Sequence, residues 1–240
     1  MIDLKEKLKQ LLNENNINDA QLKAVLFDMD GVLVDSMKFH ASSWVKAMTD
    51  IGLAFTANEA YMNEGRTGHS TIDNAMLQQL GRSSTEHERE TIYRLKSDYF
   101  EACGPVQPMA FANELLQKIK QQGKDIVLVT GSGQATLLDG LNTNFPGIFS
   151  KNKMVTAYDV TNGKPHPEPF LTGLKKADIT AEHAIVVENA PLGVEAAKKA
   201  GIFTIAVNTG TLSDDVLYES GADIVLPSVE YLCKIWDDLF

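Results

Sequence analysis

Two aspartates separated by one residue, Asp28 and Asp30, are the residues in this chain best placed for chemistry. They directly follow the apolar run 24–27, and Gly31 after them permits a tight turn. Two carboxylates that close together repel each other unless a cation offsets their charge, and hard carboxylate oxygens suit Mg²⁺. An aspartate can also attack phosphorus to form an aspartyl-phosphate, while a neighbouring carboxyl protonates the leaving oxygen and later activates water. The alternative explanation is a solvated turn after a strand.

A segment of hydroxyl residues around a glycine follows another apolar run. Thr130, Gly131 and Ser132 come directly after the run 126–129. Backbone N–H groups beside a glycine are exposed, so they can hold a phosphate together with the hydroxyls. The segment is therefore a candidate phosphate site, and an ordinary helix N-cap is the alternative.

A lysine and two polar residues at a strand end complete the set. Lys164 lies in a loop stiffened by three prolines, and its ammonium could offset the charge of both the nucleophile and a phosphoryl group. Glu188 and Asn189 follow the run 184–187, where they would supply an anionic Mg²⁺ ligand and a neutral oxygen or amide donor. Each residue alone has an ordinary structural explanation, but their order at successive strand ends favours an active site.

The elements that would position these residues alternate between strands and helices. Apolar runs of this length, rich in β-branched residues, suit strands buried on both faces of a parallel sheet, and stretches with helical spacing lie between them. This alternation predicts a doubly wound α/β domain of the Rossmann type, which binds ligands at the carboxyl ends of its strands. The runs are 24–27, 126–129, 184–187, 203–207 and 224–226, and the helical stripes are Phe111, Leu115, Leu116 and Ile119, then Val194, Ala197 and Ala200.

One long interval after the first strand contains no convincing strand. Its apolar residues recur at helical spacing, for example Ile72, Met76, Leu77 and Leu80, and its glycines divide it into about four helices. We predict a helical cap domain at 37–107, inserted into an α/β core domain formed by 1–36 and 108–240. The segment 1–20 predicts an amphipathic helix that packs on the core or on another subunit; Leu4, Leu8, Leu11 and Leu12 share one of its faces.

Composition limits the partners and the location of the protein. The 240 residues include 22 basic and 32 acidic ones, a net charge of −10, which opposes binding to nucleic acid or to an anionic membrane. Two distant cysteines support neither a disulfide framework nor a zinc cluster. No run reaches the roughly 20 apolar residues of a membrane span, and no signal peptide is evident. We therefore expect a cytoplasmic protein, and we expect a monomer.

The order of four segments resembles a known superfamily. The segments DMDGVLVDS, VTGS, GKPHPEPF and VVENAPLGVEAAKKAG resemble the haloacid dehalogenase superfamily of phosphotransferases over residues 22–230. The helical insertion, whose first helix begins with FHASSW, is similar to that of the β-phosphoglucomutase-like branch.

The resemblance implies a role for each matching residue. Asp28 would be the nucleophile and a Mg²⁺ ligand, and Asp30 would be the general acid and base that also offers its backbone carbonyl to the metal. Thr130 and Lys164 would hold the phosphoryl group, and Glu188 would bind Mg²⁺. In the mutase, a histidine at the position of His40 couples substrate binding to acid–base positioning; a hinge histidine bonded to the backbone is the alternative.

The cap loop departs from the mutase pattern. Alignment on Gly65 places Gly68 where the mutase has an arginine that grips the distal phosphate, while Arg66 lies nearby as a displaced candidate for substrate binding. Glu64 replaces a lysine, and Asn189 replaces the second acid of the metal site.

The combination of Glu64 and Asn189 resembles the inorganic pyrophosphatase variety of the same branch. By that resemblance, Glu64 would complete the Mg²⁺ shell when the cap closes on a very small substrate, and Lys96 would neutralise the leaving phosphate. The alternative for Glu64 is a solvated loop residue.

We therefore predict a Mg²⁺-dependent phosphohydrolase that acts on a small phosphorylated substrate through an aspartyl-phosphate. Inorganic pyrophosphate is the first predicted substrate, and a β-phosphoglucomutase or small sugar-phosphate phosphatase is the alternative. A third hypothesis is a phosphate-binding module without catalytic activity. The presence of Asp28, Asp30 and Lys164 argues against it, because binding alone requires neither a nucleophile nor a proton shuttle.

Overall fold

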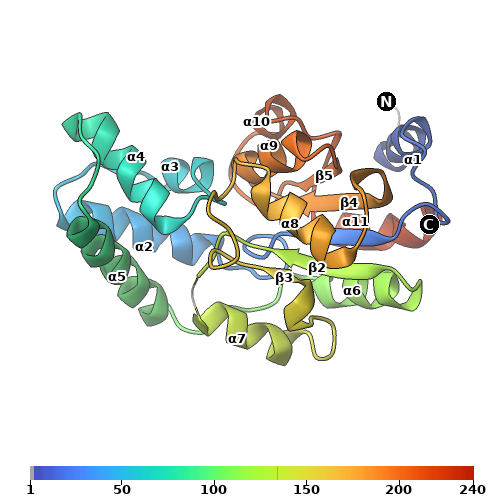
Figure 1. Ribbon diagram of the computed structural model, residues 1–240, viewed down its shortest axis with the longest axis horizontal. Helices are drawn as coiled ribbons and strands as arrows, with labels where there is room; N and C mark the ends of the chain where they lie inside the picture. Colours follow the sequence, from blue (N-terminus) through green and yellow to red (C-terminus); the bar gives the residue numbers. More distant parts are fainter. Residues whose placement is uncertain (1–2, 134) are drawn as a thin grey trace.

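A parallel sheet of six strands forms the centre of the structure, a computed structural model that describes residues 3–133 and 135–240. The strand order is β3-β2-β1-β4-β5-β6, so the sheet is doubly wound as predicted (Figure 1). The strands are β1 (Ala24–Phe27), β2 (Asp125–Val129), β3 (Met154–Val155), β4 (Ala184–Glu188), β5 (Phe203–Val207) and β6 (Ile224–Leu226).

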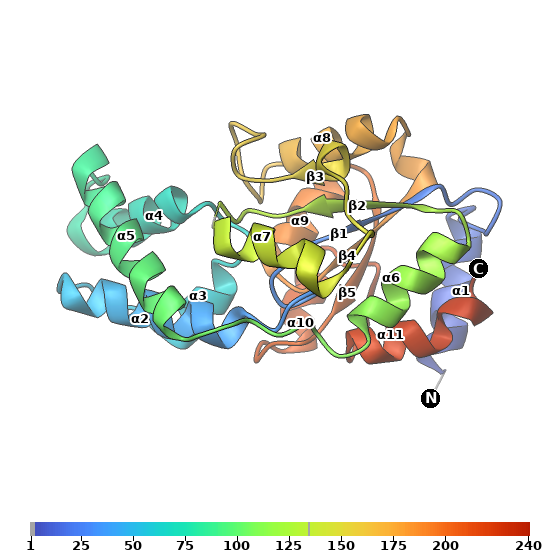
Figure 2. The same ribbon diagram turned by 90° about the horizontal axis from the view of Figure 1, so that it is seen from below.

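The strands are buried because helices cover both faces of the sheet. In β1, Val25 and Phe27 point to one face and Ala24 and Leu26 to the other, as the alternation of a strand requires. One face carries α1 (Leu4–Glu14), α6 (Ala112–Gln121), α7 (Ala135–Asn144) and α11 (Val229–Ile235), and the other carries α8 (Glu168–Ala177) and α9 (Pro191–Lys199) (Figure 2). The remaining elements of this part are α10 (Asp214–Glu219) and the 3₁₀ turns η1 (Lys151–Lys153), η2 (Ala181–His183) and η3 (Trp236–Asp238).

The N-terminal helix packs on this core. The sequence had left open whether it packs on the core or on another subunit. Leu8 and Leu12 are buried in the same cluster as Trp236, and Lys5 forms an ion pair with Asp238. Helix α1 therefore acts as part of the α/β core.

Two sequence predictions are corrected by the structure. Phe111 does not belong to the buried stripe of α6, because it is the N-cap residue with a left-handed φ of 64° and is 38% exposed. Strand β3 was not predicted, because its two residues are too few to give a recognisable apolar run.

Four helices lie beyond one edge of the sheet and form a cap with its own apolar core (Figure 1). They are α2 (Met37–Asp50), α3 (Ala57–Met62), α4 (Gly68–Leu80) and α5 (Glu86–Ala102). Trp44, Met48, Ile72 and Ile92 fill this core. Leu77 and Leu80 are about half exposed, so the predicted stripe of α4 is correct only for Ile72 and Met76. The residue boundaries of the two domains stay a prediction.

The sheet register aligns the ends of the central strands. Phe27 at the end of β1 lies opposite Leu128 of β2 and Val187 of β4. The residues that follow these three positions therefore meet at one edge of the sheet, on the side of the cap. Among the described residues, none of the helices is both long and apolar enough to cross a membrane.

Candidate active site

The site lies at the carboxyl ends of β1 and β4, where the strand order reverses. A doubly wound sheet opens a crevice at this point, and Asp28 directly follows β1 while Glu188 ends β4. Gly31 turns the chain after Asp28 with a φ of +81°, and a side chain at this position would begin 2.1 Å from the amide nitrogen of Asn189. The glycine thus allows the β4 loop to approach the two aspartates.

Lys164 joins the two strand ends. Its buried ammonium donates to Oδ1 of Asp28 at 2.5 Å, to Oε1 of Glu188 at 2.6 Å and to the carbonyl of Val129 at 3.0 Å. The pKa of Asp28 is raised to about 8: burial is the main cause, Lys164 opposes it, and the charges of Glu188 and Asp30 add to it. A second cation beside Asp28, in addition to Lys164, would favour the carboxylate form that a nucleophile requires at neutral pH.

Glu188 is completely buried and held through both carboxylate oxygens. Its Oε2 accepts hydrogen bonds from the backbone N–H groups of Asn189 and Ala190 at 2.8 and 2.9 Å, at the start of α9. Gly193 makes room for it, because a side chain there would begin 1.7 Å from Oε1. The carboxylate is thus fixed beside Lys164 and Asp28.

Asp30 is oriented by two donors that converge on Oδ1. The hydroxyl of Ser36 donates to it at 2.5 Å, and Nε2 of His40 lies 3.1 Å away. Burial opposes the ionisation of Asp30, but His40, Ser36 and Lys96 outweigh it and hold the pKa of this carboxyl below its ordinary value. Sequence reasoning assigned no role to Ser36, although its hydroxyl closes the motif that begins with Asp28.

His40 links Asp30 to the cap lysine. The ammonium of Lys96 lies 2.8 Å from Nδ1 of His40. A charged lysine can only donate, so Nδ1 is the acceptor and Nε2 carries the hydrogen that is donated to Asp30. Burial and the Lys96 charge lower the pKa of His40, which favours this neutral form. The predicted residues His40 and Lys96 therefore meet at the site.

Glu64 reaches the core from the cap loop and is buried, not solvated. Its Oε1 accepts a hydrogen bond from Nδ2 of Asn189 at 3.0 Å. Burial and the nearby charge of Asp28 raise the pKa of Glu64 well above its ordinary value. The cap and the core thus meet through a polar contact near Asp28.

The donors around Asp28 suit a hard divalent cation. The Oδ1 atom of Asn189 is buried and has no hydrogen-bond partner within the described part of the chain, so it is an unused ligand. The carboxylates of Asp28 and Glu64 provide the anionic oxygens that Mg²⁺ prefers. In the ranges 3–133 and 135–240, no three His, Cys, Asp or Glu side chains group as a metal site, so a cation here would also need neutral ligands such as the amide of Asn189.

The predicted phosphate segment lies at the end of β2. Thr130 is buried, and its Oγ1 accepts a hydrogen bond from the backbone N–H of Ser132 at 3.0 Å. Gly131 faces the cap loop, where a side chain would begin 2.6 Å from the carbonyl oxygen of Gly65. All three residues line the cavity, as a phosphate site requires.

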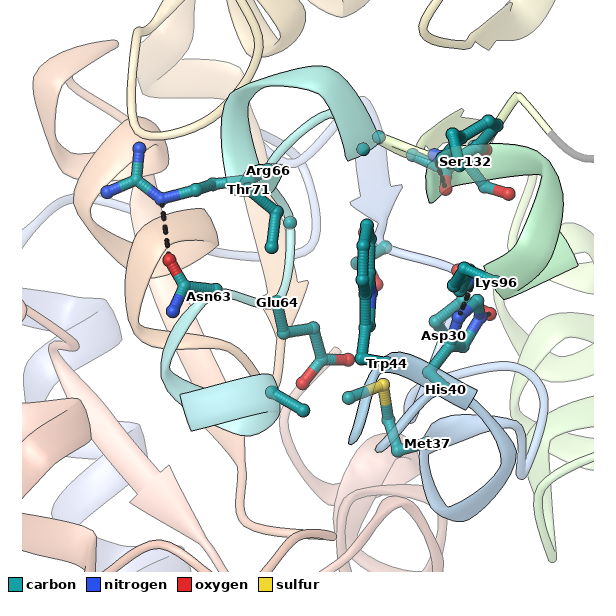
Figure 3. Close-up of a pocket in the computed structure, with 17 residues that line it drawn as sticks. Asp30, Met37, His40, Trp44, Asn63, Glu64, Arg66, Thr71, Lys96 and Ser132 are labelled. Carbon is teal, nitrogen blue, oxygen red and sulfur yellow. Dashed lines mark hydrogen bonds and ion pairs between the residues drawn. The ribbon is translucent and has the colours of Figure 1, made fainter. Parts of the chain in front are cut away.

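A cavity of about 70 Å³ lies between the cap and the core, and most of the predicted residues border it. Figure 3 shows Glu64 on one side of Trp44 and the Lys96–His40 pair on the other. Arg66 extends away from Asp30, and its Nε donates to Oδ1 of Asn63 at 3.0 Å (Figure 3). Residues that line the cavity but had no predicted role include Met37, Trp44, Gly68, Thr71 and Tyr93.

A family model matches most of the chain. The model, described as haloacid dehalogenase-like hydrolase, matches residues 25–207. The matched range runs from the second residue of β1 to the last residue of β5, and so contains Asp28, Lys164 and Glu188.

Relatives of known name support the same assignment. The validoxylamine A 7'-phosphate phosphatase of Streptomyces hygroscopicus subsp. limoneus is 30% identical, and the match covers 85% of this chain and 92% of that protein. The β-phosphoglucomutase of Bacillus subtilis is 24% identical, with 90% and 96% covered. A solved structure from Bacteroides vulgatus, provisionally described as a β-phosphoglucomutase, is 50% identical with a TM-score of 0.91, and 98% and 96% of the two chains are covered.

Proposed function

This chain belongs to the haloacid dehalogenase-like hydrolase family, and from that premise we propose that it removes phosphate from a small phosphorylated substrate. Asp28 would attack phosphorus and form an aspartyl-phosphate. Asp30 is a carboxylate in the free protein because its pKa is low, so it would take up a proton when the substrate binds and give that proton to the oxygen that leaves. Asp30 would then take a proton from water, which attacks the aspartyl-phosphate and regenerates Asp28.

The observation that carries this proposal is that the two aspartates have different hydrogen-bond partners. Asp28 is bonded to Lys164, while Asp30 is held separately by Ser36 and His40. One carboxyl therefore lies beside a cation and the other between two hydrogen-bond donors, and these different environments support different roles for the two aspartates.

Several residues have supporting roles in this mechanism. Lys164 and Thr130 would stabilise the charge on the phosphoryl group. We propose that Asp28, Glu64, Asn189 and the carbonyl of Asp30 hold Mg²⁺. Glu188 was also predicted as a ligand, but both of its oxygens accept hydrogen bonds, from Lys164 and from backbone N–H groups, so we place it beside the cation. The bound cation would neutralise charge on the carboxylates and on the phosphoryl oxygens.

The names of the relatives favour a sugar phosphate as substrate. They are a validoxylamine A 7'-phosphate phosphatase and two proteins named as β-phosphoglucomutases, and they support the alternative better than inorganic pyrophosphate, the first substrate predicted from the sequence. We therefore propose a phosphatase or phosphomutase of small sugar phosphates as the primary function.

A specific observation keeps pyrophosphate as the second candidate. The bond between Glu64 and Asn189 closes the cap onto the core and leaves a cavity of about 70 Å³. Typical small-molecule pockets have roughly 300–1,000 Å³. A substrate without a sugar ring requires less room, and Lys96 lies at the cavity with a charge that suits a leaving phosphate.

The test is phosphate release by the purified protein with Mg²⁺ from pyrophosphate and from a panel of hexose phosphates. A phosphatase should release phosphate from at least one of them, and acid quenching followed by mass spectrometry should find a phosphoryl group on Asp28. Conversion of β-glucose 1-phosphate into glucose 6-phosphate would identify the mutase. Absence of phosphate transfer from every compound, with Asp28 unmodified, would refute the proposal.

A further inference from the structure

The ring of Tyr93 occupies the space that a side chain at Gly68 would require. Gly68 is the first residue of α4, and a Cβ on it would lie 2.2 Å from Cε2 and 2.3 Å from Cδ2 of Tyr93. No side chain larger than hydrogen fits at position 68 while Tyr93 keeps its present place, because real Cβ atoms do not approach other atoms so closely.

Tyr93 lies on the same wall of the cavity as the cap lysine. It precedes Lys96 by three residues on α5, so both side chains project from one face of that helix. Tyr93, Lys96 and Gly68 all line the cavity. The Tyr93 ring contacts His69 edge-on, with 6.0 Å between the ring centroids, and lies 6.5 Å from the centroid of Trp44.

This wall of the cavity would face the leaving group of the substrate. Asp28, Thr130 and Lys164 of the core would hold the phosphoryl group, so the rest of the substrate must extend past Asp30 toward the cap. Burial raises the pKa of Tyr93 to about 12, and the charges of Tyr158 and Asp30 raise it too, so the ring stays neutral near neutral pH. Tyr93 thus restricts space there without adding charge.

We propose that Tyr93, admitted by Gly68, is a specificity-determining residue that limits the size of the leaving group beside Asp30. The inference rests on the proposed function, because it assumes that a phosphoryl compound enters this cavity. It goes further by naming the side chain that decides between a compact and a bulky substrate.

Binding to catalytically disabled protein separates this proposal from the proposed reaction. In an Asp28→Asn background with Mg²⁺, calorimetry would measure the dissociation constants of pyrophosphate and of glucose 6-phosphate. Tyr93→Ala should raise the affinity for glucose 6-phosphate relative to pyrophosphate about tenfold, as the loss of a wall group does in other pockets. Tyr93→Leu serves as a milder variant should the alanine protein fail to fold, and it should change the ratio in the same direction.

Two controls test whether the effect comes from the space at Gly68. Tyr99→Ala removes a ring from the same helix outside the cavity and should leave the affinity ratio unchanged. Gly68→Ala should weaken both ligands by displacing Tyr93, and adding Tyr93→Ala should restore binding. Gly140→Ala is the matched glycine control, because nothing lies within 4 Å of a Cβ there.

The outcomes are distinct. A changed affinity ratio supports the role of Tyr93 even if the parent protein hydrolyses neither compound, which would refute only the proposed reaction. A ratio within about twofold of the parent, or no binding of either compound in any variant, would overturn the inference.

Discussion

The carbonyl oxygen of Gly65 in the cap lies where the side chain of Gly131 in the core would begin. A Cβ on Gly131 would be 2.6 Å from that oxygen, which is closer than real Cβ atoms come. The absence of a side chain at Gly131 therefore permits contact between the cap loop and the phosphate segment. The contact brings backbone against backbone beside Thr130.

This relationship predicts the effect of Gly131→Ala. The new methyl group should hold the cap loop away from the core and so misplace Glu64 by about an ångström. We expect kcat/KM to fall about a hundredfold, as small misplacements at active sites do. Steady-state kinetics would measure it, with Gly140→Ala as the control. An unchanged kcat/KM in a folded Gly131→Ala protein would show that this contact is not required.

Replacement of Lys164 by Met should reduce stability and activity together. Asp28 and Glu188 would lose their common partner, and the removal of one member of a buried ion pair costs about 3–5 kcal/mol. The rate should fall about 10²–10³-fold because a stabilising cation is lost. Urea unfolding would measure the free energy, and Lys198→Met, which removes a partly exposed pair with Asp223, should cost about 1 kcal/mol or less. Equal losses in the two variants would contradict the prediction.

Lys96 should make stability depend on pH in a defined direction. Burial lowers its pKa to about 8 in the folded protein, from 10.5 when the chain is unfolded. Below pH 8 the ammonium is charged in both states and its burial costs the full free energy, on the order of 3 kcal/mol. As the pH rises from 8 to 10.5, the folded protein loses this proton first and the cost disappears.

The corresponding variant is Lys96→Met, which removes the buried charge. Its free energy of unfolding should exceed that of the parent most at pH 7, and the difference should shrink as the pH approaches 10. Phosphate release should nevertheless decrease. Lys96→Arg keeps a charge over this range and should not show the gain. Denaturant unfolding at pH 7, 8, 9 and 10 would measure both, and a difference that grows with pH would show that the sign is wrong.

Ser36 should matter for the rate more than for the fold. Ser36→Ala removes the 2.5 Å hydrogen bond to Asp30, so the acid–base carboxyl would be less well oriented. We expect kcat to fall about tenfold to a hundredfold with KM nearly unchanged. Ser42→Ala removes an exposed hydroxyl from the same helix and is the control. Equal kcat values for the two variants would assign Ser36 to structure alone.

The convergence of the core residues could be predicted from the sequence because strand ends in a parallel sheet meet at one edge. Asp28, Thr130 and Glu188 each follow or end a continuous apolar run, so their common position depends only on strand order. Lys164 was recognisable from its stiff loop. The doubly wound fold with a helical insertion is also confirmed, because continuous apolar runs and helical spacing can both be read from the sequence.

The contacts made by the cap could be predicted only in part. Glu64 and Lys96 were selected by resemblance, and their burial depends on how four helices pack, which periodicity does not specify. The ring of Tyr93 above Gly68 joins two helices whose relative position is likewise not encoded in spacing. Arg66 was also selected by resemblance, but its guanidinium donates a hydrogen bond to Asn63, three residues earlier in the chain, and extends away from Asp30.

The bond between Glu64 and Asn189 ties the admission of substrate to the assembly of the reactive centre. Its two partners are 125 positions apart in the chain, one in the cap and one in the core. Movement of the cap away from the core would break this bond and carry Glu64 away from Asn189. Substrate binding would therefore require an open cap, and the reaction would require a closed one. The proposed ligands around Asp28 would be complete only after the cap has closed on the substrate.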